Sequence, residues 1–253
     1  MQIRLGRISY LNTEPFFGDD AIREAAISAS PRQLIELLRS GDVDLAPLPL
    51  VALLDHPNLV VPVGNLGIIA PTAATTVAVR SRRALADLHG SRIGVIEDTA
   101  TSVRLLKVLL RDRYGVVDAM FGPLGEPADA ELIIGDRALP RLAPTKQLPI
   151  VTDLGLEWFT WTGLPFVFAL WMARIGADAE GVAAAVDYLS HSLDQNLADP
   201  GILHRRRPDL GLSEQAIHAY VTALQYRMDD AAWRGVARFR ELDARRDAKE
   251  DAA

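Results

Sequence analysis

A short first strand is predicted near the start of the chain by the apolar residues Ile3, Leu5 and Ile8. It ends at Ser9-Tyr10-Leu11-Asn12, and Pro15 marks the turn that follows. Polar groups at the end of a strand often face a ligand in α/β proteins. Ser9, Tyr10 and Asn12 are therefore candidate binding residues.

A helix over residues 31–40 is predicted by signals at both of its ends. Ser30 suits the N-cap, Pro31 suits the first helical position, and Gln33 completes a capping box. Gly41 is placed to end the helix, and residues 43–46 predict the next strand. One face of the helix carries the apolar residues Leu34, Leu37 and Leu38.

The same alternation of strand and helix signals returns later in the chain. A helix is expected to start at residues 99–102, and the pattern from residue 178 onward is helical with an interruption at 200–211. Further strands are predicted at residues 77–79, 92–96, 116–121, 131–134 and 164–172. Repeated β-α-β units of this kind predict an α/β fold in which helices cover mixed or parallel sheets. The 253 residues suffice for two small lobes or one large domain.

The composition of the chain argues against some classes of binding partner. A net charge of -6 provides no broad basic surface, so we expect no nucleic acid partner. Arg4 and Arg7 interrupt what would be the apolar part of a secretory signal, and no apolar run reaches the roughly 20 residues of a membrane span. We therefore expect a cytoplasmic protein with no membrane partner. The basic run at residues 205–207 is interpreted as a solvated face.

The residue types that commonly hold metals are either absent or scattered. The chain has no cysteine, and its five histidines show no metal-ligand spacing, so no metal is expected. No Gly-rich dinucleotide fingerprint is present either, so we expect no cofactor.

Residues 99–102 carry hydroxyls at the predicted start of a helix, where backbone N–H groups and the helix dipole favour an anion. Thr99, Thr101 and Ser102 are therefore candidate anion-binding residues. An ordinary helix cap is the other interpretation, and the pattern of residues leaves both open.

Five segments, taken together, resemble the chorismate dehydratases. They occur in family order between residues 4 and about 173. The five are Ser9-Tyr10-Leu11-Asn12-Thr13, Gly41-Asp42-Val43-Asp44, Thr101-Ser102-Val103-Arg104-Leu105-Leu106, Ile134-Gly135-Asp136-Arg137-Ala138-Leu139 and Trp161-Thr162-Gly163-Leu164-Pro165-Phe166-Val167-Phe168.

The resemblance implies a two-lobed, periplasmic-binding-protein-like type II fold with a ligand cleft between its lobes. Residues 1–80 and 165–253 would form a discontinuous lobe one, and residues 81–164 would form lobe two. The chain would then cross between the lobes twice.

The resemblance also implies an activity. Members of the family remove water from chorismate to give 3-[(1-carboxyvinyl)oxy]benzoate, at the start of the futalosine route to menaquinone. The reaction needs no cofactor, and its small-molecule partner is chorismate. The resemblance leaves both a monomer and a homodimer as options.

By the same resemblance, the catalytic candidates are Asn12, Thr76 and Asp136. Thr76 falls where the family usually has a ligand-facing serine, and Asp136 would accept a proton or order neighbouring donors. Thr75 and Gly135 are added as substrate-binding candidates. Considered without the resemblance, Asn12 is interpreted as a turn residue, and Thr75 and Thr76 are interpreted as residues that favour a strand. Asp136 is then interpreted as an ion-pair partner of Arg137 or as a helix cap.

Other features bear on the pocket less directly. Trp158, Trp161 and Phe166 are expected to close around a ring, although single aromatic residues are more often part of a core. Four residues depart from the family pattern beside the proposed sites, where extra carboxylates and a missing guanidinium would weaken anion binding. They are Pro49, Glu97, Asp98 and Ala100.

Three other functions are compatible with parts of this pattern. A non-catalytic carboxylate-binding protein would share the fold. The related 1,4-dihydroxy-6-naphthoate synthase would share the fold and the pathway, but it fits the opening and Gly-Asp-Arg segments less well. A transcriptional effector-binding domain would need a helix-turn-helix segment, and none is left once the lobes are assigned.

Overall fold

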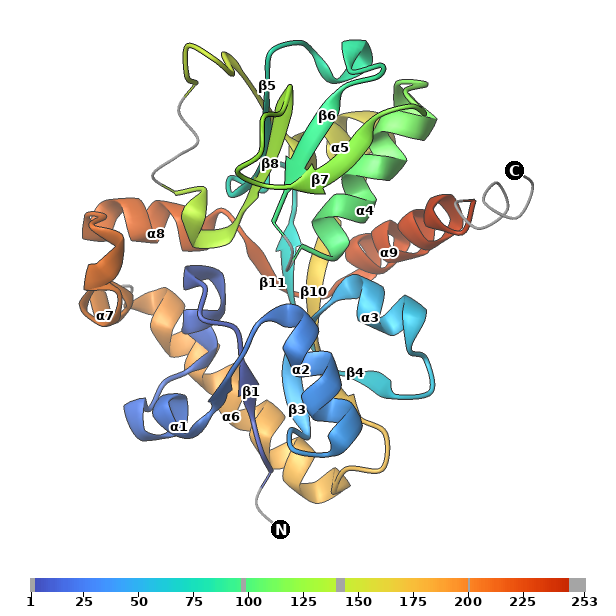
Figure 1. Ribbon diagram of the computed structural model, residues 1–253. Coiled ribbons are helices and arrows are strands. Elements are labelled where there is room, and N and C mark those ends of the chain that lie inside the picture. Colours follow the sequence, from blue (N-terminus) through green and yellow to red (C-terminus); the bar gives the residue numbers. More distant parts are fainter. Residues whose placement is uncertain (1–2, 97–98, 140–143, 200, 246–253) are drawn as a thin grey trace. The chain divides into compact units, whose positions relative to one another are not determined.

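The computed structural model describes residues 3–96, 99–139, 144–199 and 201–245. The chain divides into two compact units (Figure 1). Unit 1 contains Met1–Ile69 and Val167–Met228, and unit 2 contains Ala70–Phe166 and Asp229–Ala253.

These bounds differ from the predicted lobes at three places, because residues 70–80, 165–166 and 229–253 fall in unit 2. Strand β5 (Val77–Ser81) pairs with two strands of unit 2. Helix α9 (Asp230–Asp243) lies beside α4 (Thr101–Val108) of the same unit (Figure 1). The chain therefore passes between the units three times and not twice.

Unit 1 is built on a sheet whose strands come from both of its chain segments. The hydrogen-bonded order is β11-β4-β10-β3, and the bridge between Leu5 and Leu45 continues it to the parallel pair β1-β2. The strands are β1 (Gly6–Arg7), β2 (Ile27–Ser28), β3 (Leu45–Pro49), β4 (Val60–Ala70), β10 (Phe166–Arg174) and β11 (Gln225–Arg227). The helices are η1 (Leu11–Phe16), α1 (Asp20–Ala25), α2 (Pro31–Ser40), α3 (Leu50–Asp55), α6 (Ala179–Ala198), α7 (Gly201–Arg206), η5 (Pro208–Leu210) and α8 (Glu214–Thr222).

Unit 2 repeats this topology. Its strand order is β7-β6-β8-β5-β9, with β6 parallel to β7 and β8, and β5 antiparallel to β8 and β9. In each unit, the strand that enters from the other unit lies antiparallel beside the third strand, as β10 does beside β3. Besides β5, α4 and α9, the elements of unit 2 are η2 (Leu85–Asp87), β6 (Arg92–Val95), the π-helix η3 (Leu109–Arg113), β7 (Met120–Pro123), β8 (Ala130–Ile134), η4 (Gly135–Arg137), β9 (Ile150–Asp153) and α5 (Leu154–Thr162).

Elements with strong local signals form where they were predicted. The helix at 31–40 has its capping box, with the Ser30 hydroxyl accepting from the Gln33 N–H, and Gly41 ends it in the left-handed region at φ 80°. The strand predicted at 116–121 begins only at residue 120. Four strands of the described chain were not predicted, namely β2, β4, β9 and β11.

Each unit has an aromatic core. In unit 1, the Phe16 ring meets Trp171 edge-on at 5.3 Å and Tyr226 at 5.6 Å. In unit 2, Trp158 meets Phe166 at 5.3 Å, and its indole N–H donates to the Pro165 carbonyl at 3.2 Å. Edge-to-face pairs of this kind contribute about 0.5–1.5 kcal/mol each beyond their burial.

The expectation that Trp158 and Phe166 close around a ligand ring is therefore wrong, because both are fully buried within unit 2. Phe239 of α9 completes their cluster at 5.1 Å from Phe166. Helix α9 comes this close because Gly235 has no side chain, and a Cβ there would lie 2.2 Å from the Pro165 carbonyl oxygen.

Asp44, in one of the family-like segments, ties the sheet of unit 1 together. Its carboxylate accepts from the Arg4 Nε at 2.9 Å and from an Arg174 Nη at 3.0 Å. Arg4 is the main cause that lowers the pKa of Asp44 to about 2. The two arginines precede β1 and end β10, so the carboxylate fixes both strands beside β3.

The basic run at 205–207 is not a solvated face. Arg206 donates to the Gly18 carbonyl at 2.9 Å and to the Asp20 carboxylate at 2.6 Å. Arg207 is buried and donates to Asp209 at 2.9 Å. Only Arg205 is exposed, so two of the three arginines hold loops of unit 1 in place.

Candidate active site

The candidate residues of unit 2 gather at one edge of its sheet. Strands β6 and β8 are parallel, so their carboxyl ends lie at the same edge, and the antiparallel β5 begins there. The segments that leave this edge carry all seven candidates of the unit, which are Thr75, Thr76, Thr99, Thr101, Ser102, Gly135 and Asp136. Ligands of α/β proteins commonly bind at the carboxyl ends of parallel strands.

A direct hydrogen bond joins two of these segments. The Gly135 N–H donates to the Thr76 carbonyl at 3.0 Å, next to the register pair of Val77 and Ile134. Gly135 has φ 61°, a conformation that glycine adopts without strain. Thr76 is buried and Thr75 is exposed, so the two neighbouring side chains have different surroundings.

The turn that carries Thr75 and Thr76 is held by a residue that the sequence did not single out. The Asp153 carboxylate accepts from the Ala74 N–H at 2.9 Å, the Thr75 N–H at 2.7 Å and the Leu156 N–H at 2.9 Å. Thr75 has φ 64°, which is strained for a β-branched residue. One carboxylate thus caps helix α5 and fixes this strained turn. An Asp before an apolar helix is a signal for the cap, but not for its contact with Thr75.

The start of α4 has properties that suit an anion. Ala100 is its N-cap residue and has no polar side chain, so it cannot cap the first N–H groups. Thr99, Thr101 and Ser102 are all buried there. The Thr99 hydroxyl makes no hydrogen bond with any residue of the described chain, which leaves it available to a ligand. The ordinary cap interpretation therefore does not describe this helix start.

Asp136 lies on η4, directly after β8. The residue is half-buried, and its Oδ2 atom is fully buried. Ile134 occupies the N-cap position of η4, so Asp136 does not cap this helix. Asp136 is therefore a partly buried carboxylate that directly follows β8 at this edge of the sheet.

The three candidates of unit 1 lie on one segment. Ser9 is exposed, and its hydroxyl shares a hydrogen bond of 2.6 Å with Ser28. Tyr10 and Asn12 are half-buried at the start of η1. The Ser9 hydroxyl is therefore joined to β2, and Tyr10 and Asn12 are placed at the start of η1.

The η1 segment is held by buried polar groups that the sequence analysis missed. Thr13 donates its hydroxyl to the Ile8 carbonyl at 2.5 Å. The Glu14 side chain is only 1% exposed and forms ion pairs with Arg7 at 3.2 Å and Arg23 at 2.6 Å. From α6, the Asn196 amide donates to the Pro15 carbonyl at 3.0 Å. The backbone on both sides of Asn12 is therefore fixed, which limits how far its amide can move.

The residues that depart from the family pattern differ in their placement. Pro49 is buried at the end of β3, where it pairs in register with Ala169, so it has a structural role. Ala100 is half-buried at the start of α4, where an arginine would add a cation. Glu97 and Asp98 lie outside the described residues.

Two general features of the described residues bear on the class of site. No group of three or more metal-ligating side chains gathers anywhere in the described part of the chain. Within the same part, no helix combines the length and the apolar character that a membrane crossing requires.

Comparison with known proteins identifies the family. A family model described as menaquinone biosynthesis matches residues 3–245. The chain belongs to this family. A curated relative, the chorismate dehydratase of Thermus thermophilus, is 31% identical over 192 residues, which is 67% of this chain and 69% of the relative.

Solved structures place the family member among periplasmic-binding-protein-like folds. A crystal structure of protein AF1704 from Archaeoglobus fulgidus matches with a TM-score of 0.78 at 15% identity, and the match covers 98% of both chains. The aliphatic sulphonate binding protein SsuA from Escherichia coli matches with a TM-score of 0.61 at 17% identity, over 100% of this chain and 88% of that protein. At these identities, the likeness shows the fold alone. The predicted type II fold is thereby confirmed.

Proposed function

We propose that this member of the menaquinone biosynthesis family is a chorismate dehydratase. The observation that carries the proposal is the 31% identity to a protein of that name, within a family match that spans residues 3–245. The sheet edge of unit 2 supports it, because hydroxyls, helix N–H groups and one carboxylate lie there together. Such a set suits a small carboxylate that must also exchange a proton.

The proposed reaction removes one water from chorismate. A ring C–H bond and the C–O bond of the ring hydroxyl both break, and the proton and the hydroxyl leave together as water. The ring becomes aromatic in 3-[(1-carboxyvinyl)oxy]benzoate, so the reaction is strongly favoured once it starts. The residues must bind two carboxylates, accept the proton and stabilise the departing hydroxyl.

The candidate residues fit these tasks as follows. The start of α4, with Thr101 and Ser102, binds one substrate carboxylate through hydroxyl and backbone donors. Asp136 takes the ring proton or orders the donors around it. Asn12 donates its amide hydrogen to a carboxylate or to the leaving hydroxyl, and Thr76 supplies a further hydroxyl.

The proposed reaction also has a position in a biosynthetic route and a cellular compartment. We assign the reaction to the start of the futalosine route in the cytoplasm. The substrate is a small dianion, and the net charge of -6 does not favour a nucleic acid partner. Light scattering on the purified protein will distinguish a monomer from a homodimer.

Incubation of purified protein with chorismate tests the proposal. The expected product has lost one water and shows the ultraviolet spectrum of a substituted benzoate. Asp136→Asn is expected to lower kcat at least about 100-fold, because an amide cannot accept the proton. Folded protein that binds chorismate without turnover would support a carboxylate-binding protein. Protein that neither binds nor converts chorismate would refute the assignment, and the precursor of 1,4-dihydroxy-6-naphthoate would then be the next substrate to test.

A further inference from the structure

Unit 2 has a cavity that contains none of the candidate active-site residues. Its volume is about 470 Å³, and it lies between α4 with its π-helical extension η3, the segment before β7, and the end of α9. Cavities that bind small molecules typically measure about 300–1,000 Å³. The cavity is therefore large enough for a ligand with one or two rings.

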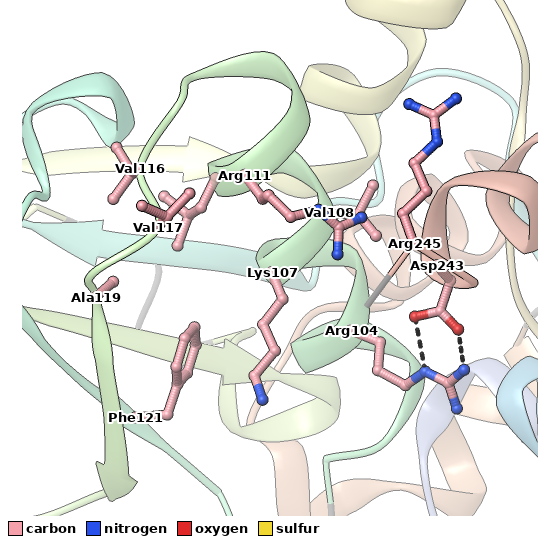
Figure 2. Close-up of a pocket in the computed structure, with 11 residues that line it drawn as sticks. Arg104, Lys107, Val108, Arg111, Val116, Val117, Ala119, Phe121, Asp243 and Arg245 are labelled. Carbon is pink, nitrogen blue, oxygen red and sulfur yellow. Dashed lines mark hydrogen bonds and ion pairs between the residues drawn. The ribbon is translucent and has the colours of Figure 1, made fainter. Parts of the chain in front are cut away.

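One side of the cavity is apolar. Val116, Val117 and Ala119 contribute to it from the loop after the helix, and Phe121 from β7. In Figure 2, Phe121 and Val117 stand on the side of the cavity opposite Arg104 and Asp243. Val117 is 71% exposed, which is unusual for a valine and extends the apolar side to the mouth of the cavity. A flat apolar group can be desolvated against this surface.

The other side is basic. Four cations and one carboxylate line the cavity, which gives three net positive charges. Two of the cations have partners just outside the lining, because Arg111 pairs with Asp112 at 2.5 Å and Arg245 with Glu241 at 2.9 Å. Arg104 pairs with Asp243, so three of the four cations have a carboxylate partner among the described residues.

The fourth cation is Lys107. Its ammonium makes no ion pair with any carboxylate of the described residues, and it lies 5.0 Å from the centre of the Phe121 ring. Figure 2 shows the Lys107 side chain running between Phe121 and Arg104, so its charge lies where the apolar and basic sides meet. An anion bound beside an aromatic ring would replace water around this ammonium.

The wall of the cavity is fixed before any ligand arrives. Arg104 and Asp243 are 9% and 5% exposed, and two parallel hydrogen bonds join them, one of them 3.0 Å from Nε to Oδ1. Arg111 donates to the Leu242 carbonyl at 2.6 Å. Because both contacts connect α4 and its extension to α9, a ligand would meet a preformed surface and lose little affinity to ordering it.

We propose that this cavity is a second binding site, which takes an aromatic carboxylate with one negative charge. The ring would lie against Val116, Val117 and Phe121, and the carboxylate would meet Lys107. Lys107 is a single cation without an ion pair among the described residues, so it can pair with one negative charge of a ligand. A phosphate dianion would also need arginines, and the arginines here already pair with carboxylates. The site goes beyond the proposed dehydratase function and does not depend on it.

Calorimetric titration with 1-naphthoate tests the site, with 1-naphthamide as the neutral probe of the same shape. We expect 1-naphthoate to bind with a dissociation constant on the order of 1 mM or below. Lys107→Gln should weaken this binding roughly tenfold, and 1-naphthamide should bind equally weakly to both proteins. Ala119→Phe should abolish binding by filling the cavity, while thermal unfolding shows that the variant remains folded.

Lys146→Gln is the matched control, because it removes the charge of an exposed lysine of unit 2 that does not line the cavity. It should leave the affinity unchanged. Equal weakening by Lys107→Gln and Lys146→Gln would reduce the effect to general electrostatics and overturn the proposal. Binding that survives Ala119→Phe would place the probe elsewhere, and no binding to the wild-type protein would also refute the site.

Discussion

Asp153→Ala is expected to disturb the candidate active site without touching any of its candidate side chains. The carboxylate accepts three backbone N–H bonds of 2.7–2.9 Å, from Ala74, Thr75 and Leu156. The first two hold the turn before β5, and the third caps α5. The substitution therefore removes a helix cap and releases a strained turn at once.

The magnitude follows from these contacts. Loss of a helix N-cap typically costs about 1 kcal/mol of unfolding free energy. The two bonds to the turn are partly exposed, and each adds about 1 kcal/mol. Relaxation of Thr75 from its left-handed conformation relieves strain, which offsets about 1 kcal/mol of this loss in unfolding free energy. We therefore expect a net loss of about 2 kcal/mol, which lowers the Tm by about 4–8 °C in a chain of this length.

The effect on activity should exceed the effect on stability. Thr76 follows the released turn, and a displacement of about 1 Å in an active site can lower the rate on the order of 100-fold. On the proposed function, Asp153→Ala should lower kcat at least about tenfold while the protein remains folded at 25 °C. Asp153→Asn keeps one acceptor oxygen and should fall between the wild type and the alanine variant.

Asp178→Ala provides the matched control for the cap. Asp178 caps α6 of unit 1 by accepting from the Gly181 N–H at 3.2 Å, and it has no contact with the Thr75 turn. It should cost about 1 kcal/mol and leave kcat unchanged. If urea unfolding gave the same loss for both alanine variants and kcat were normal in both, Asp153 would be an ordinary cap and the argument would fail.

Three further predictions concern the candidate site and the sheet of unit 1. Asn12→Ala should lower kcat more than it raises KM for chorismate, because its amide assists the departing hydroxyl; steady-state kinetics that show only a KM change would contradict this role. The double variant Thr101→Ala/Ser102→Ala should weaken substrate binding by about 1–3 kcal/mol while the backbone donors remain, and wild-type affinity in a direct titration would place the carboxylate elsewhere. Asp44→Asn should be less stable than the wild type near pH 7, and the difference should shrink as the pH falls from about 4 to about 2. The pKa of Asp44 is lowered to about 2 in the folded protein, so its stabilising effect is present above the unfolded pKa and is lost through this window; a difference independent of pH in acid unfolding would refute the argument.

Local signals in the sequence determined the helices that have strong caps. The helix at 31–40 is specified by Ser30, Pro31, Gln33 and Gly41, which all act within four residues of a helix end. The family-like segments also contain four of the candidates at the edge of the sheet in unit 2, namely Thr101, Ser102, Gly135 and Asp136. Both kinds of information lie in short stretches of chain, so they can be read before the chain is folded.

Pairing between distant stretches was decided only by the tertiary structure. β11 pairs with β4 about 160 residues earlier, and its three residues carry no strand pattern of their own. The assignment of α9 to unit 2 depends on Gly235 meeting Pro165 and on Phe239 entering an aromatic cluster. None of these contacts leaves a periodic signal in the sequence.

The same distinction separates the predicted candidate residues from the residues that hold them. Asp136 was found in a family-like segment and Thr76 by its correspondence to a serine of the family, whereas Asp153, Glu14 and Asn196 were not singled out. Asp153 and Asn196 act on backbone far away in the sequence, as Asn196 does on the Pro15 carbonyl 181 residues before it, whereas Glu14 pairs with arginines 7 and 9 residues away. A side chain that serves a distant backbone group is under no local constraint that would mark it. Its role exists only once folding has brought the two segments together.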